Sequence, residues 1–547
     1  MKIPQEIVRN YAIGISVPKV SALKDGRYQL SGVVENNTGK ELRVTLSATD
    51  SKDSKTLGSA DLSLKKGNNP FTMTAAGGDF KNSPVIFTLK TGGKDLCVQY
   101  ARPEEFSLFS AYTHLNYYMN EPEALFRVSC ALEKPETLTA RLQCGSLQTE
   151  SKAAEEFTIR LPLKDLPDGT HEAVVELYGK SGKVAETKTV LVRKPFRKGA
   201  VRINQHRRCL VADGKNILPF MPLISIWPFQ KNREDVVKFL AENGFKSVMI
   251  VISRNAVDNA KKFMEAAEKQ GIKVLYWDGQ TRTMTDEQLA QQAGMLGGYS
   301  NILANLVIDE PELYTKSDET KALLSRVRAK SPYYPVFMNN TVIGIPNRFA
   351  DLNTDILMLD DYLTNKENRT VREIVDQMDI LWKAGKSEHK PCYYFLVGNN
   401  MHNHYREPTA AEQVAETYGS IAANCTGLTY FMGIPSYPEH WKAYLALNRE
   451  ILALNDVILS DETVPEAALS DATLRHITRK HGGYLYVIAA NIDNHPSSDV
   501  VVTLPSGLKY DDSAEAMFEN RRLKVSNGKL TDSFPGYSRR VYKVKLR

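Results

Sequence analysis

Acidic residues follow directly after a strongly apolar segment near the middle of the chain. Residues 306–308 (Leu-Val-Ile) are too apolar to be anything but a buried strand, and they lead straight into Asp309 and Glu310. An ionised carboxylate at such a place is costly unless it has a functional or structural partner. Pro311 then ends the strand, and both acids lie too far before the helix predicted from Ser317 to cap it. Glu310 is therefore the strongest candidate for a catalytic residue, with proton transfer as its chemistry.

A second acidic pair ends another apolar segment. Residues 356–359 lead into Asp360 and Asp361 and, because side chains alternate along a strand, only one of the two should face the site. Glycosidic bond cleavage requires two carboxyl groups across a pocket: one protonates the departing oxygen, and the other stabilises or attacks the oxocarbenium-like centre. Asp360 or Asp361 is the expected catalytic partner of Glu310, and Asp278 is a third acid at a strand end.

Aromatic and amide side chains occur at the same strand ends. Indole rings stack on the apolar faces of a sugar ring, while amide, carboxylate and guanidinium groups bind its hydroxyls. The residues expected to contact a sugar are Trp227, Trp277, Asp278, Asp309, Asn339, Tyr362, Asn399, His402 and Arg406.

Metal and cofactor chemistry is not expected from these strand ends. They hold no cluster of histidines, no Ser/His/Asp set and no lysine placed for a Schiff base. His402 and His404 have a spacing that can chelate a metal, but no third ligand is evident nearby, so a sugar contact or a plain loop is favoured.

The elements that must position these residues are eight apolar segments that alternate with segments of helical period. This pattern is typical of a TIM (β/α)₈ barrel, whose active site lies at the carboxyl ends of its strands. A doubly wound open sheet is the alternative, but it requires a glycine-rich turn after its first strand, and residues 227–230 (Trp-Pro-Phe-Gln) are not one. The strands are expected at 218–227, 247–253, 273–278, 303–310, 335–340, 355–362, 393–399 and 427–433, with helices such as 233–243, 257–270, 317–330, 371–384 and 409–424.

The chain on either side of this region alternates between apolar and polar residues, with a turn about every ten residues. Such a period of two predicts antiparallel β-sandwiches. We expect an immunoglobulin-like sandwich at 1–103, a second sandwich at 104–198, the catalytic barrel at 199–459 and a C-terminal sandwich at 460–547.

Composition excludes several classes of function. Among 547 residues, 42% are hydrophobic and 24% charged, as in an ordinary globular protein, and the net charge of +6 is spread along the chain. Dedicated nucleic-acid binding needs a concentrated basic face and is therefore not expected. No segment approaches the roughly 20 apolar residues of a membrane span. Residues 1–6 lack an apolar export segment, so we expect a cytoplasmic protein, or a periplasmic or secreted one whose signal was removed.

The six cysteines are far apart and include no C-x-x-C pair, which argues against a zinc ribbon or a redox motif. Cys130 and Cys144 flank a predicted hairpin turn and could pair, but free buried thiols are favoured.

The segment 306–312 (Leu-Val-Ile-Asp-Glu-Pro-Glu) resembles the fourth-strand signature of clan A glycoside hydrolase barrels, in which a Glu before Pro is the acid/base. Those barrels usually have Asn where this chain has Asp309. Residues 406–413 and 422–431 are similar to the seventh helix and eighth strand of bacterial β-galactosidase-like proteins near families 42 and 2. The turn at 213–215 and the order of sandwiches before barrel also look like family 2. The resemblance implies a glycosidase with Glu310 as acid/base.

The chain departs from clan A at the seventh strand, which ends in Val397-Gly398-Asn399-Asn400 where the clan has its nucleophilic Glu. Three interpretations remain open. Asp360 or Asp361 completes the pair, as sixth-strand acids do in some α-glycosidase barrels; Glu407 or Glu439 folds back from a loop; or the site is not hydrolytic. Related sequences end the sixth strand in Asp-x-Tyr, which Asp360-Asp361-Tyr362 matches, so Asp360 is slightly favoured.

The leading hypothesis is an exo-acting glycoside hydrolase that degrades polysaccharide, needs no cofactor and has a carbohydrate as its partner. A glycan-binding barrel without catalysis is the alternative.

Overall fold

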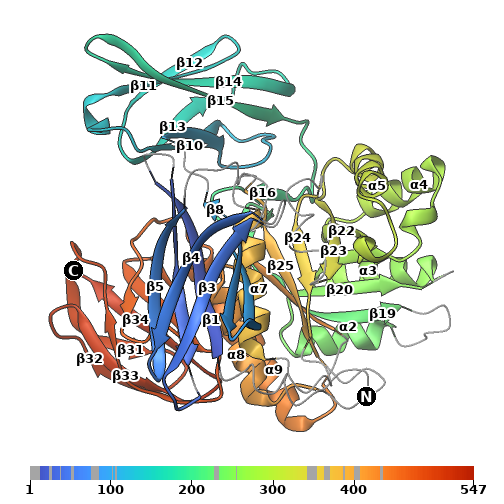
Figure 1. Cartoon of the computed structure of the whole chain (residues 1–547). Helices are drawn as coiled ribbons and strands as arrows, with labels where there is room; N and C mark the ends of the chain where they lie inside the picture. Colours follow the sequence, from blue (N-terminus) through green and yellow to red (C-terminus); the bar gives the residue numbers. More distant parts are fainter. Residues whose placement is uncertain are drawn as a thin grey trace.

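The computed structural model describes residues 13–23, 27–36, 38–50, 55–75, 85–101, 103–104, 108–226, 233–253, 256–341, 354–362, 370–385, 389–398, 407–431 and 435–547. A closed barrel with helices around it is flanked by two sandwiches before it and one after it in the chain (Figure 1). The prediction of a TIM barrel with N-terminal and C-terminal β-sandwiches is confirmed.

The barrel consists of eight parallel strands that pair in chain order and close between the first and the last. Its strands are almost continuously buried, as expected when helices cover one face and side chains fill the other. They are β19 (Phe220–Ile226), β20 (Ser247–Ile252), β21 (Lys273–Asp278), β22 (Ile302–Asp309), β23 (Val336–Thr341), β24 (Leu357–Asp360), β25 (Cys392–Val397) and β26 (Gly427–Phe431).

Within the described residues, six α-helices and two short 3₁₀ turns connect these strands, and a seventh α-helix follows the last strand. Three of the helices begin with a capping box, in which Thr285, Thr370 or Thr409 accepts a hydrogen bond from the backbone three residues later. The helices are α2 (Arg233–Glu242), α3 (Val257–Lys269), α4 (Asp286–Gly297), α5 (Ser317–Lys330), α7 (Val371–Ala384), α8 (Ala410–Ala422) and α9 (Pro438–Ile458), and the turns are η2 (Thr281–Thr283) and η3 (Pro311–Leu313).

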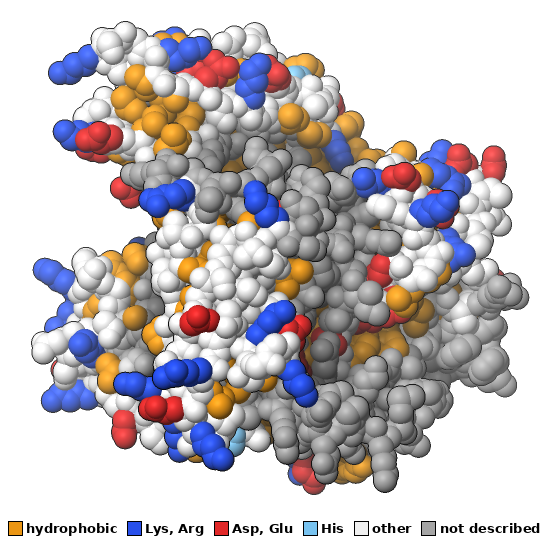
Figure 2. All heavy atoms as spheres, viewed as in Figure 1, with side chains coloured by type: hydrophobic (Ala, Val, Ile, Leu, Met, Phe, Trp, Pro, Cys, Tyr) orange, Lys and Arg blue, Asp and Glu red, His pale blue; other side chains and the backbone are white. Residues whose placement is uncertain are grey.

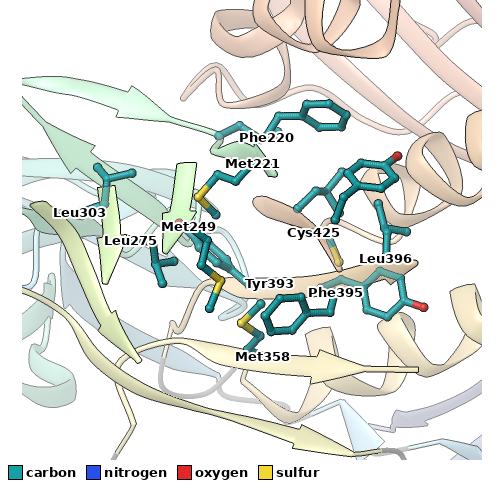
Figure 3. Packing of buried hydrophobic residues seen from close by; sticks show 14 of the residues in the cluster. Phe220, Met221, Met249, Leu275, Leu303, Met358, Tyr393, Phe395, Leu396 and Cys425 are labelled. Atoms are coloured by element: carbon teal, nitrogen blue, oxygen red, sulfur yellow. The ribbon is translucent and has the colours of Figure 1, made fainter. Parts of the chain in front are cut away.

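Large side chains fill the middle of the barrel. Figure 3 shows Met249, Met358 and Tyr393 converging between the strands, and all three are fully buried. The interior is therefore a packed core, and any binding site must lie above it at one end of the strands.

The first sandwich packs two four-stranded sheets, in the orders β5-β2-β1-β8 and β4-β3-β6-β7. Its strands are β1 (Ile13–Ala22), β2 (Tyr28–Asn36), β3 (Leu42–Asp50), β4 (Thr56–Leu64), β5 (Gly67–Ala75), β6 (Val85–Thr91), β7 (Lys94–Ala101) and β8 (Pro103–Glu104).

The second sandwich has sheets ordered β13-β10-β9 and β12-β11-β14-β15. Cys130 and Cys144 are buried in its core as free thiols, and the other four cysteines are free as well. The strands are β9 (Phe109–Thr113), β10 (Glu123–Cys130), β11 (Thr139–Cys144), β12 (Leu147–Lys152), β13 (Glu156–Pro162), β14 (Gly169–Gly179) and β15 (Gly182–Arg193).

A small three-stranded sheet leads into the barrel. Asp213 and Gly214 both have positive φ and form the tight turn between its second and third strands. The strands are β16 (Arg202–Asn204), β17 (Cys209–Ala212) and β18 (Lys215–Ile217).

The C-terminal sandwich has sheets ordered β27-β30-β33 and β28-β29-β34-β31-β32, and α8 packs against β29 and β34. Its strands are β27 (Ala468–Leu469), β28 (Arg475–His481), β29 (Tyr484–Asn491), β30 (Ser497–Thr503), β31 (Tyr510–Ala516), β32 (Arg521–Lys524), β33 (Lys529–Phe534) and β34 (Ser538–Leu546). The expected domain boundaries stay predictions.

Charged side chains of both signs are interspersed on the face shown in Figure 2, where basic residues form no continuous stripe. Among the described helices, none is both long enough and apolar enough to cross a bilayer.

One arginine of the barrel joins three domains. Arg372, near the start of α7, lies 3.4 Å from Glu35 of the first sandwich and donates from Nε to Asp493 of the C-terminal sandwich at 2.9 Å. Its side chain and that of Glu35 are almost fully buried. A buried charge that loses its partner is expensive, so this group fixes how the sandwiches pack on the barrel.

We expect Arg372→Ala to lower the free energy of unfolding by about 3–5 kcal/mol, because it leaves the buried carboxylate of Glu35 and the half-buried carboxylate of Asp493 without their cation. Denaturant unfolding followed by tryptophan fluorescence measures the change. Arg141→Ala, which removes an exposed pair with Glu150, is the matched control and should have little effect. Equal stabilities of the two variants would contradict the role given to Arg372.

Candidate active site

Polar side chains from three neighbouring strands meet inside the barrel at the carboxyl ends of β22, β23 and β24. Met358 lies in the barrel interior, so alternation along β24 places Asp360 on the same side. Phe337 contacts the interior ring of Tyr393, so Asn339, two residues later on β23, also faces inward. Asp309 ends β22 directly beside Asn339.

The amide of Asn339 comes from the strand between those of the two acids. Asn339 Nδ2 donates to Asp309 Oδ1 at 2.9 Å, and the Tyr362 hydroxyl donates to Asp360 Oδ2 at 3.2 Å. Asp360 Oδ1 and Asn339 Oδ1 are buried and have no hydrogen-bond partner among the described residues. Buried polar atoms are rarely left unsatisfied, so these two oxygens are available to a carboxyl proton or to a hydroxyl of a bound ligand.

The acids raise one another's pKa. Burial is the main cause for Asp309, whose pKa rises to about 6, and the charges of Glu310 and Glu312 add to it. Burial also raises the pKa of Asp360 well above its usual range, and the charges of Asp309 and Glu310 raise it further. Because like charges so close together cannot all ionise cheaply, the folded site favours the protonated form of Asp360.

Glu310 has an unusual backbone conformation. Its φ of 39° and ψ of 49° lie in the left-handed region, which costs a non-glycine residue about 1–2 kcal/mol. Its N–H donates to the carbonyl of Asn339 at 3.0 Å, and Pro311 begins η3 immediately after it. The half-buried side chain acts electrostatically on Asp309, Glu312 and Asp360. Strain of this kind is often kept where a side chain must be aimed for function.

The connection after β22 adds two residues that sequence reasoning missed. Glu312 accepts a hydrogen bond from Asn340 Nδ2 at 2.9 Å and another from the backbone N–H of Thr341. Tyr314 is 49% exposed and its hydroxyl donates to the carbonyl of Asp309, while the guanidinium of Arg282 lies 4.6 Å from its ring centre. An exposed aromatic ring beside buried acids suits sugar stacking. In the sequence, only the position of Tyr314 just after the fourth strand could have indicated it.

Trp277 and Asp278 point in opposite directions at the end of β21. Asp278 is 2% exposed and accepts hydrogen bonds from the backbone N–H of Gln280 at 2.9 Å and from Gln292 of α4 at 3.3 Å. It therefore faces the helices, where it ties β21 to α4. Trp277 is half-buried and alternation turns it toward the barrel interior. This geometry favours Trp277 as a sugar contact and disfavours Asp278.

The other acids considered from the sequence are placed away from the Asn339 amide. Asp361 is buried, and its carbonyl accepts the hydroxyl of Tyr394, whose strand neighbours Tyr393 and Phe395 face the interior. Glu407 accepts from the Ser436 N–H at 2.8 Å and from His440 at 2.9 Å, just before α9.

Glu439 is exposed in the first turn of α9. Among these acids, the geometry favours Asp360 as the partner of Glu310. Trp227, Asn399, His402 and Arg406 lie outside the described residues, so their expected sugar contacts stay predictions. Within the described part of the chain, no three His, Cys, Asp or Glu side chains are grouped to hold a metal ion.

No family model and no curated protein matches this sequence. Solved structures resemble it in overall fold. A Bacteroides vulgatus ATCC 8482 protein assigned as a glycoside hydrolase is 12% identical, with a TM-score of 0.45, over 78% of this chain and 98% of that one. An Anoxybacillus α-amylase is 10% identical, with a TM-score of 0.42, over 63% and 99%. A GH2 β-galacturonidase from Eisenbergiella tayi is 12% identical, with a TM-score of 0.36, over 78% and 90%. Likenesses this distant carry no argument about substrate or reaction.

Replacing Asp309 by asparagine tests the cost of its buried charge. A folded pKa of about 6, above the ordinary 3.8, means that the folded state favours the protonated acid. Wild-type stability is therefore lost as the pH rises from about 4 through about 6. We expect Asp309→Asn to exceed the wild type by on the order of 2 kcal/mol at pH 7 and by almost nothing at pH 4, in denaturant unfolding.

Asp258→Asn, at a side chain that is 88% exposed, is the control for the Asp309 measurement and should show no such dependence on pH. If the difference in free energy of unfolding between Asp309→Asn and the wild type is the same at pH 4 and pH 7, the ionised form of Asp309 does not destabilise the folded state.

A second prediction concerns the left-handed backbone conformation of Glu310. Glycine tolerates positive φ and alanine does not, so Glu310→Gly should be about 1 kcal/mol more stable than Glu310→Ala. The same pair of substitutions at Glu319, in the first turn of α5, should give the opposite order because glycine weakens a helix. Thermal and denaturant unfolding of the four variants measure both differences. If alanine is the better residue at position 310, the left-handed conformation is refuted.

Proposed function

We propose that the protein is a glycoside hydrolase whose reaction takes place where Asp309, Asn339 and Asp360 meet. The observation that carries this proposal is a buried carboxyl group, Asp360, and a half-buried one, Asp309, on either side of the Asn339 amide, with a third acid, Glu310, beside them. Carboxyl groups whose environments separate their pKa values can divide the acid and base roles between them. The fold places them at the carboxyl ends of the strands, where barrels of this type carry their active sites.

Asp360 is proposed as the general acid. Its raised pKa keeps the proton that must pass to the departing glycosidic oxygen as the C–O bond breaks and the bonding electrons go to that oxygen. Glu310 is proposed as its partner, which attacks the anomeric carbon or takes a proton from the attacking water. The resemblance implies the acid/base role for Glu310, whereas the raised pKa of Asp360 supports the reverse division of roles.

The surrounding residues are proposed to bind the sugar. Asp309 and Asn339 offer oxygens to its hydroxyls, and the rings of Trp277 and Tyr314 offer apolar faces. Exo-action, a polysaccharide substrate, a bacterial source and membership of clan A near families 42 and 2 are proposals that rest on the resemblance of residues 213–215, 306–312, 406–413 and 422–431 and on the order of sandwiches before barrel. A cytoplasmic location, or a periplasmic or secreted one after removal of a signal, is likewise a proposal.

The second candidate is a glycan-binding barrel without catalysis. It is favoured by β25, which ends in Val397 and Gly398 without the carboxylate that clan A barrels have there. Chromogenic glycosides tested beside a glycan array separate the two functions, because binding without turnover supports this candidate.

Substitutions at the acids test the division of roles. Asp360→Asn should lower kcat about 10²–10⁴-fold on glycosides with poor leaving groups, yet keep most activity on 2,4-dinitrophenyl glycosides, whose leaving group needs no proton. Glu310→Gln should lower turnover on both kinds of substrate, since the attacking group is lost whichever group leaves.

Asp361→Asn, the same change one residue along, is the matched control and should stay within a few-fold of the wild type. Wild-type turnover in both Asp360→Asn and Glu310→Gln would refute the hydrolase proposal. If Asp309→Asn abolishes turnover while Glu310→Gln has normal turnover, Asp309 and not Glu310 is the partner of Asp360.

A further inference from the structure

A small cavity lies at the opposite end of the barrel from the candidate active site. Its wall includes His206 and Arg207 between β16 and β17, Asn424 and Thr426 before β26, Ile458 at the end of α9, and Arg479 on β28. Segments from the barrel entry, the barrel and the C-terminal sandwich therefore meet there. The cavity volume is about 40 Å³, which exceeds the roughly 10–15 Å³ that one water needs.

Two arginines supply positive charge to this wall. Arg479 is 9% exposed; its Nε donates to the carbonyl of Ile458 at 3.1 Å and its Nη2 to Asn424 Oδ1 at 2.8 Å. Arg207 donates from Nη2 to the carbonyl of Glu462 at 3.0 Å. Its Nε is buried and has no hydrogen-bond partner among the described residues.

The nearby acids do not balance these charges well. Asp461 lies 4.0 Å from Arg207 Nε, and it also accepts from Asn204 and lies 3.5 Å from His114. Glu466 lies 3.8 Å from Arg479 Nη1, but its side chain is 55% exposed to water. The guanidinium groups of Arg479 and Arg207, whose side chains are 11% and 16% exposed, thus share the cavity wall with one carboxylate that has other partners and one that is solvated. The potential inside the cavity is therefore positive.

The histidine adds a hydrogen-bond donor. His206 Nδ1 lies 3.1 Å from the hydroxyl of Tyr112, so the neutral ring can carry its proton on Nε2. His206 Nε2 is buried without a partner among the described residues. Burial and the charges of Arg207 and Arg127 lower the pKa of His206 to about 3, which agrees with a positive environment.

We propose that this cavity binds a small inorganic oxyanion of the phosphate or sulfate type. Arg207 Nε and His206 Nε2 would donate hydrogen bonds to its oxygens, and the charge of Arg479 would complete the balance. The bound anion would satisfy both unpartnered nitrogens and hold together three parts of the chain that are distant in sequence. This site is separate from the proposed glycosidase site and does not depend on it.

Binding is tested on the full chain by isothermal titration with sodium phosphate and with sodium sulfate, against sodium chloride at the same ionic strength. We expect saturable binding of one anion per chain for at least one of the two, together with a rise in melting temperature that follows ligand concentration. Arg207→Gln should weaken this binding at least tenfold and His206→Gln should weaken it less. Arg160→Gln, an exposed arginine paired with Glu123, removes the same charge and should leave binding unchanged.

Equal responses to phosphate, sulfate and chloride at fixed ionic strength would overturn the proposal and show that the cavity holds only water. Unchanged binding in Arg207→Gln would also overturn it. If Arg207→Gln does not fold, His206→Gln is measured in its place, and wild-type anion binding by that variant overturns the proposal. No arm measures glycoside turnover, so the outcome is independent of the proposed function.

Discussion

The geometry of the candidate site depends on one hydrogen bond inside a low-dielectric barrel, from the amide of Asn339 to the carboxylate of Asp309. That donor stabilises one negative charge, and the same amide also lowers the pKa of Asp360. A single amide cannot compensate two buried charges, so the cost of desolvation and repulsion leaves a proton on one of the acids. The different environments of Asp309 and Asp360 decide which acid keeps it.

The rest of the structure keeps these groups from moving apart. Below them, Met249, Met358 and Tyr393 fill the barrel, so the ends of β22 to β24 rest on a packed core. Beside them, the ring of Tyr362 stacks on Phe431 at 5.5 Å, which orients its hydroxyl toward Asp360. Outside the barrel, Arg372 ties α7, the helix that follows β24 in the chain, to the first sandwich and to the C-terminal sandwich.

Sequence patterns sufficed for the barrel because its strands are uniformly apolar and its helices have a clear period. They also predicted Asn339 and Asp360 as site residues, and the structure places both near the carboxyl ends of their strands. The same patterns were insufficient for Asp278, whose partner Gln292 lies on a helix fourteen residues later. Strand ends have two faces, and only the contacts of the folded chain show which face a side chain occupies.

The connection after β22 was harder to predict for a different reason. The positions of Glu312 and Tyr314 follow from the left-handed turn at Glu310, which no residue preference would suggest for a glutamate before proline. The basic cavity was equally hidden, because its wall combines segments more than 200 residues apart. Neither the turn nor the cavity leaves a local pattern in the sequence.

The position of the acids also bears on the departure from clan A. In that clan the two carboxylates come from the fourth and seventh strands, whereas here the acids cluster on the fourth and sixth, β22 and β24. Strands two apart are separated by about 10 Å, and Asp309 reaches across part of that gap to the amide of Asn339. Glu310 lies one residue beyond the end of β22, so the distance between Glu310 and Asp360 differs from the distance between Asp309 and Asp360. A wider pair leaves room for a water between the carboxyl groups and favours inversion, and a closer pair favours retention. For the proposed hydrolase, the stereochemistry of the product therefore distinguishes Asp309, which ends β22, from Glu310 as the partner of Asp360.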